Sequence, residues 1–345
     1  MIQKKLLYFG QATWGSTSLQ RYNSLKECFS TTYIIDSRRV MPDKPYRSFF
    51  KSVQGRVGFG PILSESRNIL IQECKRFNPD ILWVDGGYFV SDSTINKLKE
   101  DGIMCVHYTP DSILAPGLSN RCFKRAIKSY DFLVTTKKQD LSMYKKHSAT
   151  NLIFSFQGFD PSIHKEEEGV EEKYSSDVVF VGQCMKERME YLDYLNNNLK
   201  CNLKIFGPGW DEATLPKGLN SKCFGPVIHS DYAKVLSGSK IALGFLNTEV
   251  KDQFTTRSFE IPSCGPLLIA PRTDEHLEIF EEDKEAVFFS NKEEFLDKIS
   301  FYLSNPEKRD AIAIQGKSKV LNGMFTWTDL IRKNLKDMKK KVIVF

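Results

Sequence analysis

The sequence predicts an α/β protein built from two Rossmann-like, doubly wound domains, and three observations support this. The chain has 345 residues, which is too long for one ordinary core and suits two domains of about 150 residues each. Short apolar runs alternate with longer amphipathic stretches, as is typical of βα units around a parallel sheet. This alternation stops once, at residues 161–176, and then starts again.

Six short apolar runs in the first half have the length of buried strands, at residues 5–9, 32–36, 80–84, 104–108, 132–135 and 152–154. Amphipathic stretches between them predict helices over residues 18–29, 66–77 and 93–100. The segment 40–60 contains two prolines and three glycines, so we expect it to begin as a loop.

The segment 161–176 is polar, includes three consecutive glutamates and lacks apolar periodicity, so it predicts a linker between domains at 1–160 and 177–325. After it, strands are predicted over 177–182, 203–206, 240–245 and 266–270. Helices are predicted over 186–199, 230–237, 255–263, 291–303 and 307–321, and a last helix over about 326–341.

The composition is that of a globular protein without a membrane span. Hydrophobic residues make up 41% and charged residues 27%, which excludes a long disordered tract or a fibrous repeat. No stretch approaches the ~20 apolar residues of a membrane span, and the apolar run at the start is short for a signal peptide, so we expect a cytoplasmic location. The eight cysteines are scattered without metal-binding spacing and are interpreted as reduced thiols.

Ligands of such domains bind beyond the carboxyl ends of the strands. The segment 252–270 places two hydroxyls and Arg257 at a predicted helix start there, with Glu260 one turn further on. A carboxylate at Glu260 can accept both hydrogens of a ribose cis-diol, which indicates a nucleotide site. The alternative is that Arg257 and Glu260, three positions apart, only pair on a solvated helix face.

The run Arg257-Ser-Phe-Glu260-Ile-Pro-Ser-Cys-Gly265 and the residues that follow resemble the C-terminal signature of CgeB-like and related GT-B glycosyltransferases, the glycosyl transferases of group 1. The resemblance extends back to Val179-Phe-Val-Gly182 and covers nearly the whole second half. It implies the GT-B fold, two Rossmann-like domains facing a central cleft. In this fold the last helix, here within 326–345, often crosses back to the first domain.

The resemblance also implies an activity, the transfer of a sugar from a nucleotide-sugar donor to a hydroxyl acceptor. The family's pattern of two acidic residues separated by seven falls on Asp252 and Glu260. Glu260 would hold the ribose and Asp252, which is shorter than the usual Glu, would touch the donor sugar. The start of the helix at Thr255-Thr256 would stabilise the departing diphosphate.

Further donor contacts follow from the same resemblance. Gly182 would let the backbone approach the phosphates, and Arg188 or Lys186 would neutralise them. Arg188 could instead be a solvated helix charge. Main-chain groups of Val227 and Ile228 would read the nucleobase.

The first half offers fewer candidates. The glycine-rich loop that includes Trp14 and Gly15 follows the first strand and could lie near the sugar or acceptor, or could be only a turn. His107 and Asp111 end the fourth strand, and Asp111 could take the proton of the acceptor hydroxyl as a general base. The alternative makes Asp111 a turn or cap residue and His107 a packing residue.

Cofactors and partners are predicted from what the sequence contains. It has no Asp-x-Asp and no carboxylate cluster spaced for a divalent ion, so we expect neither a metal nor another cofactor, only a nucleotide-diphosphate sugar as substrate. Residues 121–147 hold eight Lys or Arg against two Asp, which suits an anionic membrane surface, a lipid-linked acceptor or simply a solvated face. By resemblance, the acceptor is a glycan or lipid-linked glycan in surface polysaccharide synthesis.

Three other functions were weighed against this one. A nucleic-acid partner is not expected, because the pI of 8.7 is modest and the aromatic residues do not interleave with the basic ones. A dinucleotide-dependent enzyme would need a G-x-G-x-x-G fingerprint, which is missing from the sequence. A non-catalytic protein that binds nucleotide-sugars stays open.

Overall fold

The computed structural model describes all residues except 41–52, 55–57, 114–119, 212–214, 228–229 and 342–345. It divides into two compact units, which we call unit 1 and unit 2. Unit 1 combines residues 1–157 with 327–345, and unit 2 comprises residues 158–326. The segment 161–176, predicted as a linker, belongs to unit 2 in this division.

Unit 1 is built on a parallel sheet of six strands in the order β2-β1-β3-β4-β5-β6. The strands are β1 (Ile2–Gly10), β2 (Phe29–Asp36), β3 (Ile81–Asp85), β4 (Met104–Thr109), β5 (Phe132–Thr135) and β6 (Leu152–Phe154). All six predicted strands are therefore present. The direction of the crossovers reverses between β1 and β3, which makes the carboxyl ends of these two strands the switch point of unit 1.

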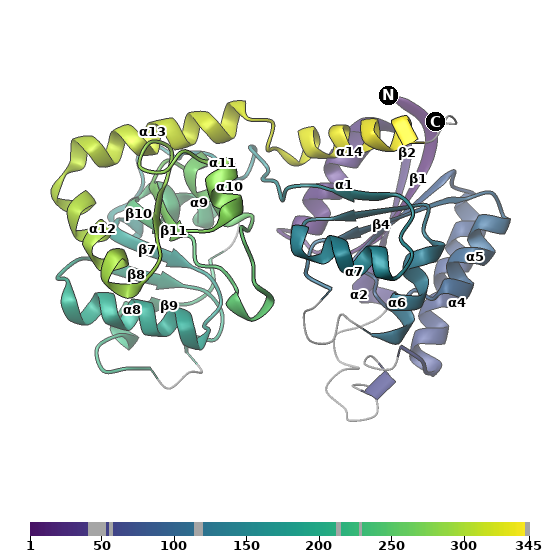
Figure 1. The fold of residues 1–345 in the computed structure, drawn as a ribbon, viewed down its shortest axis with the longest axis horizontal. Coiled ribbons are helices and arrows are strands. Elements are labelled where there is room, and N and C mark those ends of the chain that lie inside the picture. The colour runs from purple at the N-terminus through teal and green to yellow at the C-terminus, as the bar shows by residue number, and fades with distance from the viewer. Residues whose placement is uncertain (41–52, 55–57, 114–119, 212–214, 228–229, 342–345) are drawn as a thin grey trace. The chain divides into compact units, whose positions relative to one another are not determined.

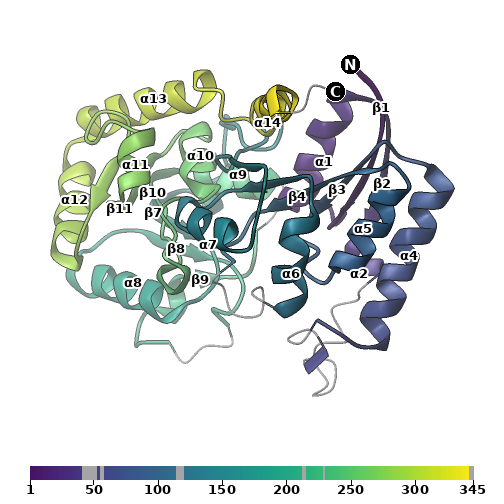
Figure 2. The same cartoon turned by 45° about the vertical axis from the view of Figure 1, so that its right-hand side comes forward.

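Helices cover both faces of this sheet (Figure 1, Figure 2). They are α1 (Thr17–Cys28), α2 (Ser37–Val40), α4 (Pro61–Phe77), α5 (Asp92–Glu100), α6 (Arg121–Ala126), α7 (Leu141–Lys146) and α14 (Trp327–Lys341). Alternate side chains of β1 serve the two faces: Leu7 and Phe9 pack with α4, α5 and α6, whereas Leu6 and Tyr8 pack with α1 and α14. The predicted loop 40–60 lies largely outside the described residues.

The last helix, α14, is an integral part of unit 1. Trp327, Ile331 and Met338 are buried in the same core as Leu6 and Trp83 of the sheet. The indole Nε1 of Trp327 donates a hydrogen bond of 2.8 Å to Gln20 Oε1 of α1. The chain therefore returns to complete the core that its first residues begin.

Unit 2 has a second parallel sheet, in the order β12-β11-β10-β7-β8-β9. Its strands are β7 (Ser176–Val181), β8 (Leu203–Phe206), β9 (Cys223–Phe224), β10 (Ser239–Leu243), β11 (Leu267–Pro271) and β12 (Val287–Phe289). The crossovers reverse between β7 and β10, which defines the switch point of unit 2. The two shortest strands, β9 and β12, were not predicted.

The helices of unit 2 are α8 (Lys186–Asn198), α9 (Ser230–Ser237), α10 (Arg257–Ser263), α11 (Asp274–Ile279), α12 (Lys292–Ser304) and α13 (Pro306–Asn322). Leu192 of α8 and Phe295 of α12 pack with Phe180 and Leu243 against one face of the sheet. Short 3-10 helices occur in both units. In unit 1 they lie at Ile127–Ser129 and Lys138–Asp140, and in unit 2 at Glu172–Tyr174, Asn220–Lys222 and Thr248–Val250.

The two segments that enter and leave unit 2 lie side by side. The amide of Phe159 donates to the carbonyl of Phe325 at 3.3 Å, and Phe159 forms a parallel bridge with Thr326. Unit 2 therefore begins and ends at one place on its own surface.

Candidate functional site

Two neighbouring loops meet through their backbone at the carboxyl end of β7, beside the switch point of unit 2. Gly182 follows β7 and its amide donates to Phe206 O at 2.8 Å. A Cβ on Gly207, which follows β8, would lie 2.0 Å from Gly182 O, and Gly207 has a φ of +141°. Only glycine allows this approach, so the main chain of the two loops packs closely at the carboxyl ends of β7 and β8.

Helix α10 directs the guanidinium of Arg257 to the same point. Its Nε donates to Val181 O, at the end of β7, at 3.1 Å, and its Nη1 donates to Glu260 Oε2 at 2.5 Å. The guanidinium carbon lies 4.9 Å from the centre of the Tyr232 ring. The Arg257 side chain is 34% exposed, so a fixed cation faces solvent at the switch point.

Glu260 is enclosed by its partners. Its side chain is 3% exposed, Oε2 also accepts from the Tyr232 hydroxyl at 2.8 Å, and Oε1 lies 3.6 Å from His164 Nε2. Burial by itself raises the pKa of Glu260, but Arg257, His164 and the hydrogen bonds outweigh burial and lower that pKa overall. The pairing of Arg257 with Glu260 is therefore present, but it is buried instead of lying on a solvated face.

Arg188 supplies a second cation near Arg257. Its Nη1 donates to Gln183 O at 3.2 Å, and its guanidinium lies 5.7 Å from the Phe180 ring centre. Its Nε is buried and has no hydrogen-bond partner among the described residues. Burial, and next the charge of Arg257, lower the pKa of Arg188. Two arginines that repel each other, one with an unsatisfied donor, make a site that an anion would stabilise.

A cavity of about 400 Å³ lies beside these arginines, at the carboxyl ends of β10, β11 and β12. Arg188, Asp252 and Gln253 line it, together with the rings of Tyr191 and Phe289. The predicted sugar contact Asp252 and the predicted phosphate contact Arg188 therefore share one cavity.

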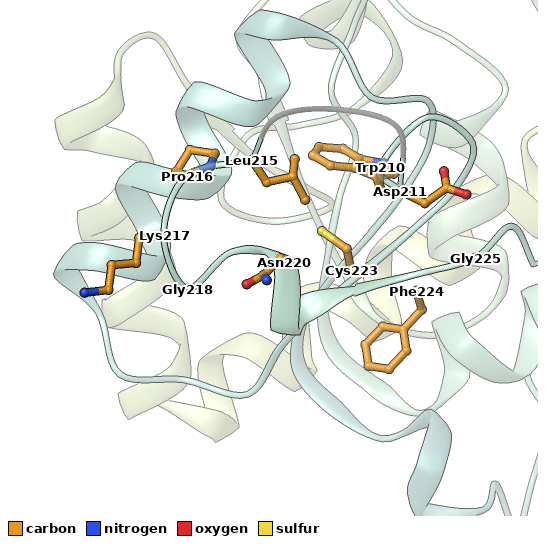
Figure 3. Close-up of a pocket in the computed structure, with 10 residues that line it drawn as sticks. All are labelled: Trp210, Asp211, Leu215, Pro216, Lys217, Gly218, Asn220, Cys223, Phe224 and Gly225. Carbon is orange, nitrogen blue, oxygen red and sulfur yellow. The ribbon is translucent and has the colours of Figure 1, made fainter.

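A second cavity, of about 570 Å³, lies at the carboxyl ends of β8 and β9 (Figure 3). Trp210, Cys223 and Gly225 belong to its wall, and the Trp210 Nε1 donates to Gly182 O at 2.9 Å. This cavity therefore adjoins the switch point. Val227 is half-buried two residues beyond Gly225, whereas Ile228 lies outside the described residues.

Two other predicted donor contacts, Thr256 and Lys186, lie at helix starts in unit 2. Thr256 is the residue before α10, and its half-buried side chain makes no capping hydrogen bond. Lys186 is the first residue of α8 and is exposed.

In unit 1 the predicted loop lies at the carboxyl end of β1. Trp14 is 65% exposed, and Gly15 has a φ of +81° just before Ser16, whose hydroxyl caps α1 by accepting from the Leu19 amide. The loop is therefore a tight turn at the switch point of unit 1 that also presents an exposed ring.

The structure separates His107 from Asp111. Asp111 is exposed after β4, but His107 is fully buried between Phe123 and Tyr130. The His107 Nε2 donates to Gly86 O at 2.6 Å, Nδ1 accepts from Thr109 Oγ1 at 3.0 Å, and burial lowers the pKa to about 4. Because the ring points into the core, the packing alternative describes His107.

Sequence reasoning did not find Tyr232 and His164 around Glu260, nor a buried cluster at the switch point of unit 1. There Arg21 Nε and Nη2 donate to the two oxygens of Asp85 at 2.6 and 3.0 Å, and the Tyr8 hydroxyl donates to Asp85 at 2.5 Å. The partners in each cluster come from separate elements, so no local spacing marks them.

The basic stretch 121–147 is spread over α6, β5 and α7. Lys137 in this stretch is buried, and the Lys138 amine lies 5.2 Å from the Phe154 ring centre. All eight cysteines are free thiols. Among the described residues, no helix combines the length and apolarity needed to cross a membrane.

Within the same described residues, no group of three or more His, Cys, Asp or Glu side chains is placed to hold a metal ion.

Comparison with known proteins decides the class. Residues 188–335, which include α8, the Arg188 cavity and α10, match the glycosyl transferase-like family. Solved structures of the GT-B type cover almost the whole chain. The chain therefore has the GT-B fold. The resemblance noted in the sequence is therefore confirmed, as are the fold class and the enzyme class.

Three solved structures illustrate how this chain relates to known proteins. Sucrose-phosphate synthase from Thermosynechococcus elongatus has a TM-score of 0.69 at 10% identity, over 97% of this chain and 98% of that one. Anabaena HepE in complex with UDP-glucose has a TM-score of 0.69 at 12% identity, over 98% of this chain and 100% of that one. A glycosyltransferase from Rickettsia africae has a TM-score of 0.66 at 14% identity, over 99% of each chain. A search of curated proteins found no match.

Proposed function

We propose that this protein is a glycosyltransferase that binds a nucleotide-sugar in unit 2, with the diphosphate at the carboxyl end of β7. The observation that carries this proposal is the pair Arg188 and Arg257, whose guanidinium groups bond to the main chain on either side of Gly182 and which leave a buried donor of Arg188 unsatisfied. A diphosphate would relieve the repulsion between the two guanidinium groups and accept from the unsatisfied Nε.

The two cavities beside this point suit the ends of such a donor. The cavity at Trp210 and Gly225 is assigned to the nucleobase, with main chain near Val227 as a reader, and the cavity that Asp252 lines is assigned to the sugar. The HepE structure, which contains UDP-glucose, supports a nucleotide-sugar as the ligand class for this fold.

The proposed reaction breaks the bond between the anomeric carbon and the diphosphate oxygen and forms a bond from that carbon to an acceptor hydroxyl. The departing diphosphate keeps the electron pair, and Arg188 and Arg257 stabilise its charge without a metal ion. Asp111, exposed beyond β4, is the carboxylate that we propose takes the hydroxyl proton.

For the acceptor we propose a glycan or lipid-linked glycan, in surface polysaccharide synthesis. A lipid-linked acceptor fits peripheral contact of an anionic membrane with the exposed lysines of α7 in the basic stretch. Sedimentation of the protein with vesicles of anionic and of neutral lipid distinguishes this contact from none.

The proposed donor site is tested by thermal-shift titration with UDP, GDP, ADP, CMP and NAD, with and without magnesium. We expect one nucleoside diphosphate to stabilise the protein without magnesium. Arg257→Gln and Arg188→Gln should each weaken that ligand by about 10- to 100-fold, the loss of a charged hydrogen bond. Arg332→Gln, an exposed arginine of α14, is the matched control. Stabilisation by NAD alone, or by none of the five ligands, would refute the proposal.

A further inference from the structure

We infer that the turn around Trp14 and the neighbouring Arg38 bind an acceptor sugar that carries a phosphate or carboxylate group. This inference rests on the proposed function, because it names the class of acceptor for the proposed reaction. The two residues follow β1 and β2, so they belong to unit 1 and lie outside the donor site assigned to unit 2.

Trp14 stands at the tip of a closed turn. The Ser16 amide donates to Thr13 O at 3.1 Å, which makes Trp14 and Gly15 the central residues of a β-turn. Gly15 has a φ of +81°, and a type II turn requires such a positive φ at its third residue. The Ser16 hydroxyl also donates to Gln11 O at 3.2 Å. The turn is therefore fixed at both ends, and it holds the Trp14 side chain 65% exposed.

Arg38 is attached to the same turn from the neighbouring strand. Its Nη1 donates to the hydroxyl of Thr13, the residue before Trp14, at 3.1 Å. The Asp36 Oδ1 accepts from the amide of Ala12 at 3.2 Å and from the amide of Arg38 at 3.1 Å. One carboxylate thus ties the loop after β1 to the start of α2. An exposed guanidinium is thereby held beside the turn that presents the indole.

An indole and a guanidinium recognise different parts of one ligand. The C–H groups on one face of a pyranose ring are apolar, and an indole offers a large rigid surface that buries them. A guanidinium keeps its charge and binds a phosphate or carboxylate through two parallel hydrogen bonds. Arg39, whose side chain is 90% exposed, adds a second positive charge next to Arg38. This combination favours an anionic sugar over a neutral one.

The strand order indicates where on the acceptor the charge lies. The proposed base Asp111 follows β4, which is two strands from β1 and three strands from β2. At the usual spacing of strands these separations are about 10 and 14 Å. The charged group therefore lies at the end of the acceptor away from the reacting hydroxyl. A phosphate on the anomeric carbon, or the carboxylate of an adjacent sugar, has this position.

Trp14 supplies its own spectroscopic probe, because the other three tryptophans are at most 2% exposed. The full-length protein is titrated with the 1-phosphates of glucose, galactose and mannose, with glucuronic and galacturonic acid, with the parent hexoses and with inorganic phosphate. Protection of the fluorescence from quenching by acrylamide is measured. We expect at least one anionic sugar to protect Trp14 with about tenfold higher affinity than its neutral parent. Trp14→Phe should remove most of the emission that acrylamide quenches.

The same titration separates two sources of the charge. A preference for a hexose 1-phosphate indicates an acceptor linked through phosphate, as in a lipid-linked glycan. A preference for a uronic acid indicates an acidic glycan.

Arg38→Gln tests the charge recognition. It should lower the affinity for the anionic sugar to within about twofold of that for the neutral parent, and leave the parent unchanged. Arg76→Gln is the matched control, because Arg76 is an exposed arginine of unit 1 that donates to the Tyr33 hydroxyl at 2.7 Å on α4. This control should bind every ligand as the wild type does.

Trp14→Ala tests the sugar surface by calorimetry. It should weaken charged and neutral sugars alike, by about fivefold, and leave inorganic phosphate unchanged. The inference is overturned if no anionic sugar protects Trp14, if Arg38→Gln weakens charged and neutral sugars equally, or if inorganic phosphate binds as tightly as the sugars. These ligands contain no nucleotide, so such a result leaves the donor site standing. Only the failure of every nucleoside diphosphate in the thermal-shift titration would overturn the proposed function as well.

Discussion

His107 and His276 are both fully enclosed, and each bonds through both ring nitrogens. The His276 Nδ1 donates to Pro271 O at 2.8 Å, its Nε2 accepts from the Ser258 hydroxyl at 2.8 Å, and its ring stacks on Phe288. Burial lowers the pKa of each imidazole from 6.5 to about 4. Both rings are therefore neutral in the folded protein at any pH above about 5.

These two histidines predict a loss of stability in mild acid. Below pH 6.5 the unfolded chain gains protons at both positions while the folded chain does not, so stability falls until about pH 4, where the folded rings protonate too. The loss is about 1.4 kcal/mol per pH unit for each histidine. Calorimetry from pH 7.5 to 4.5 should show falling melting temperatures.

The comparison variant for this prediction is His276→Asn, whose amide can still donate to Pro271 O. This variant should have a lower melting temperature than the wild type at pH 7.5, but its melting temperature should fall less between pH 6.5 and 4.5. A wild-type melting temperature that is constant over this interval would contradict the assignment of the buried neutral rings.

At the same scale, the sequence located part of the candidate site but not its interior. Arg257 could be placed because it lies at a predicted helix start beyond a predicted strand, whereas Gly182 and Arg188 were assigned by the family resemblance. Tyr232 and His164 could not, because they meet Glu260 only through the packing of separate segments. His107 was misleading, since a strand alternates its side chains between faces and periodicity does not tell which end residue turns inward.

At the scale of elements, the contact between the loops after β7 and β8 is the most constrained feature of unit 2. An alanine at Gly207 would put its Cβ against Gly182 O and would force a φ of +141° on an L side chain. We expect Gly207→Ala to destabilise unit 2 by about 3 kcal/mol or more and to weaken nucleoside diphosphate binding, because the main chain at Gly182 would shift.

The matched substitution is Gly102→Ala, at a glycine with a φ of +80° and open space around its Cβ position. It should cost only the backbone strain, about 1 kcal/mol, and leave ligand binding intact. Chemical denaturation and thermal shift of the two variants measure the difference. Equal effects would show that the crowding at Gly182 is unimportant.

Most elements could be predicted because apolar runs and amphipathic stretches were clear, and where they were short the prediction failed. Strands β9 and β12 have two and three residues, too few for a periodic signal. Helix α10 begins at Arg257, two residues later than expected, because Thr255 Oγ1 accepts from the Arg257 amide ahead of the first turn. The polar segment 161–176 concealed one buried contact, His164, which composition alone cannot reveal.

At the scale of the whole molecule, the return of α14 to unit 1 makes a sharp prediction. Removal of residues 327–345 would delete Trp327, Ile331 and Met338 from the core that they share with Trp83. Loss of such side chains costs about 2–5 kcal/mol each, so the three together cost about 6–15 kcal/mol, as much as the usual 5–15 kcal/mol of a domain. Unit 1 should then fail to fold stably.

Unit 2 contains none of the deleted residues, so its unfolding transition and its shift with nucleoside diphosphate should persist in the truncated protein. Calorimetry with and without the ligand tests both statements. Loss of both transitions would show that the units are not independent, and retention of both would show that α14 is dispensable.

The presence of two doubly wound units could be predicted from length and from the restart of the pattern. Periodicity could not show that unit 1 is assembled from two separate segments. The pattern of α14 predicts an amphipathic helix, but it does not tell on which of the two sheets that helix packs. Its assignment in the sequence depended on the family resemblance.

The split of unit 1 also sets an order of events during synthesis. Helix α14, which with α1 covers the face of Tyr8 and Trp83, is encoded after all of unit 2, so part of this apolar face stays uncovered on the growing chain until the ribosome has translated α14. Unit 2, although it comes second, is the first whose residues are all present. A nascent chain paused within unit 2 is therefore the species with the greatest exposure to chaperones and to misassembly.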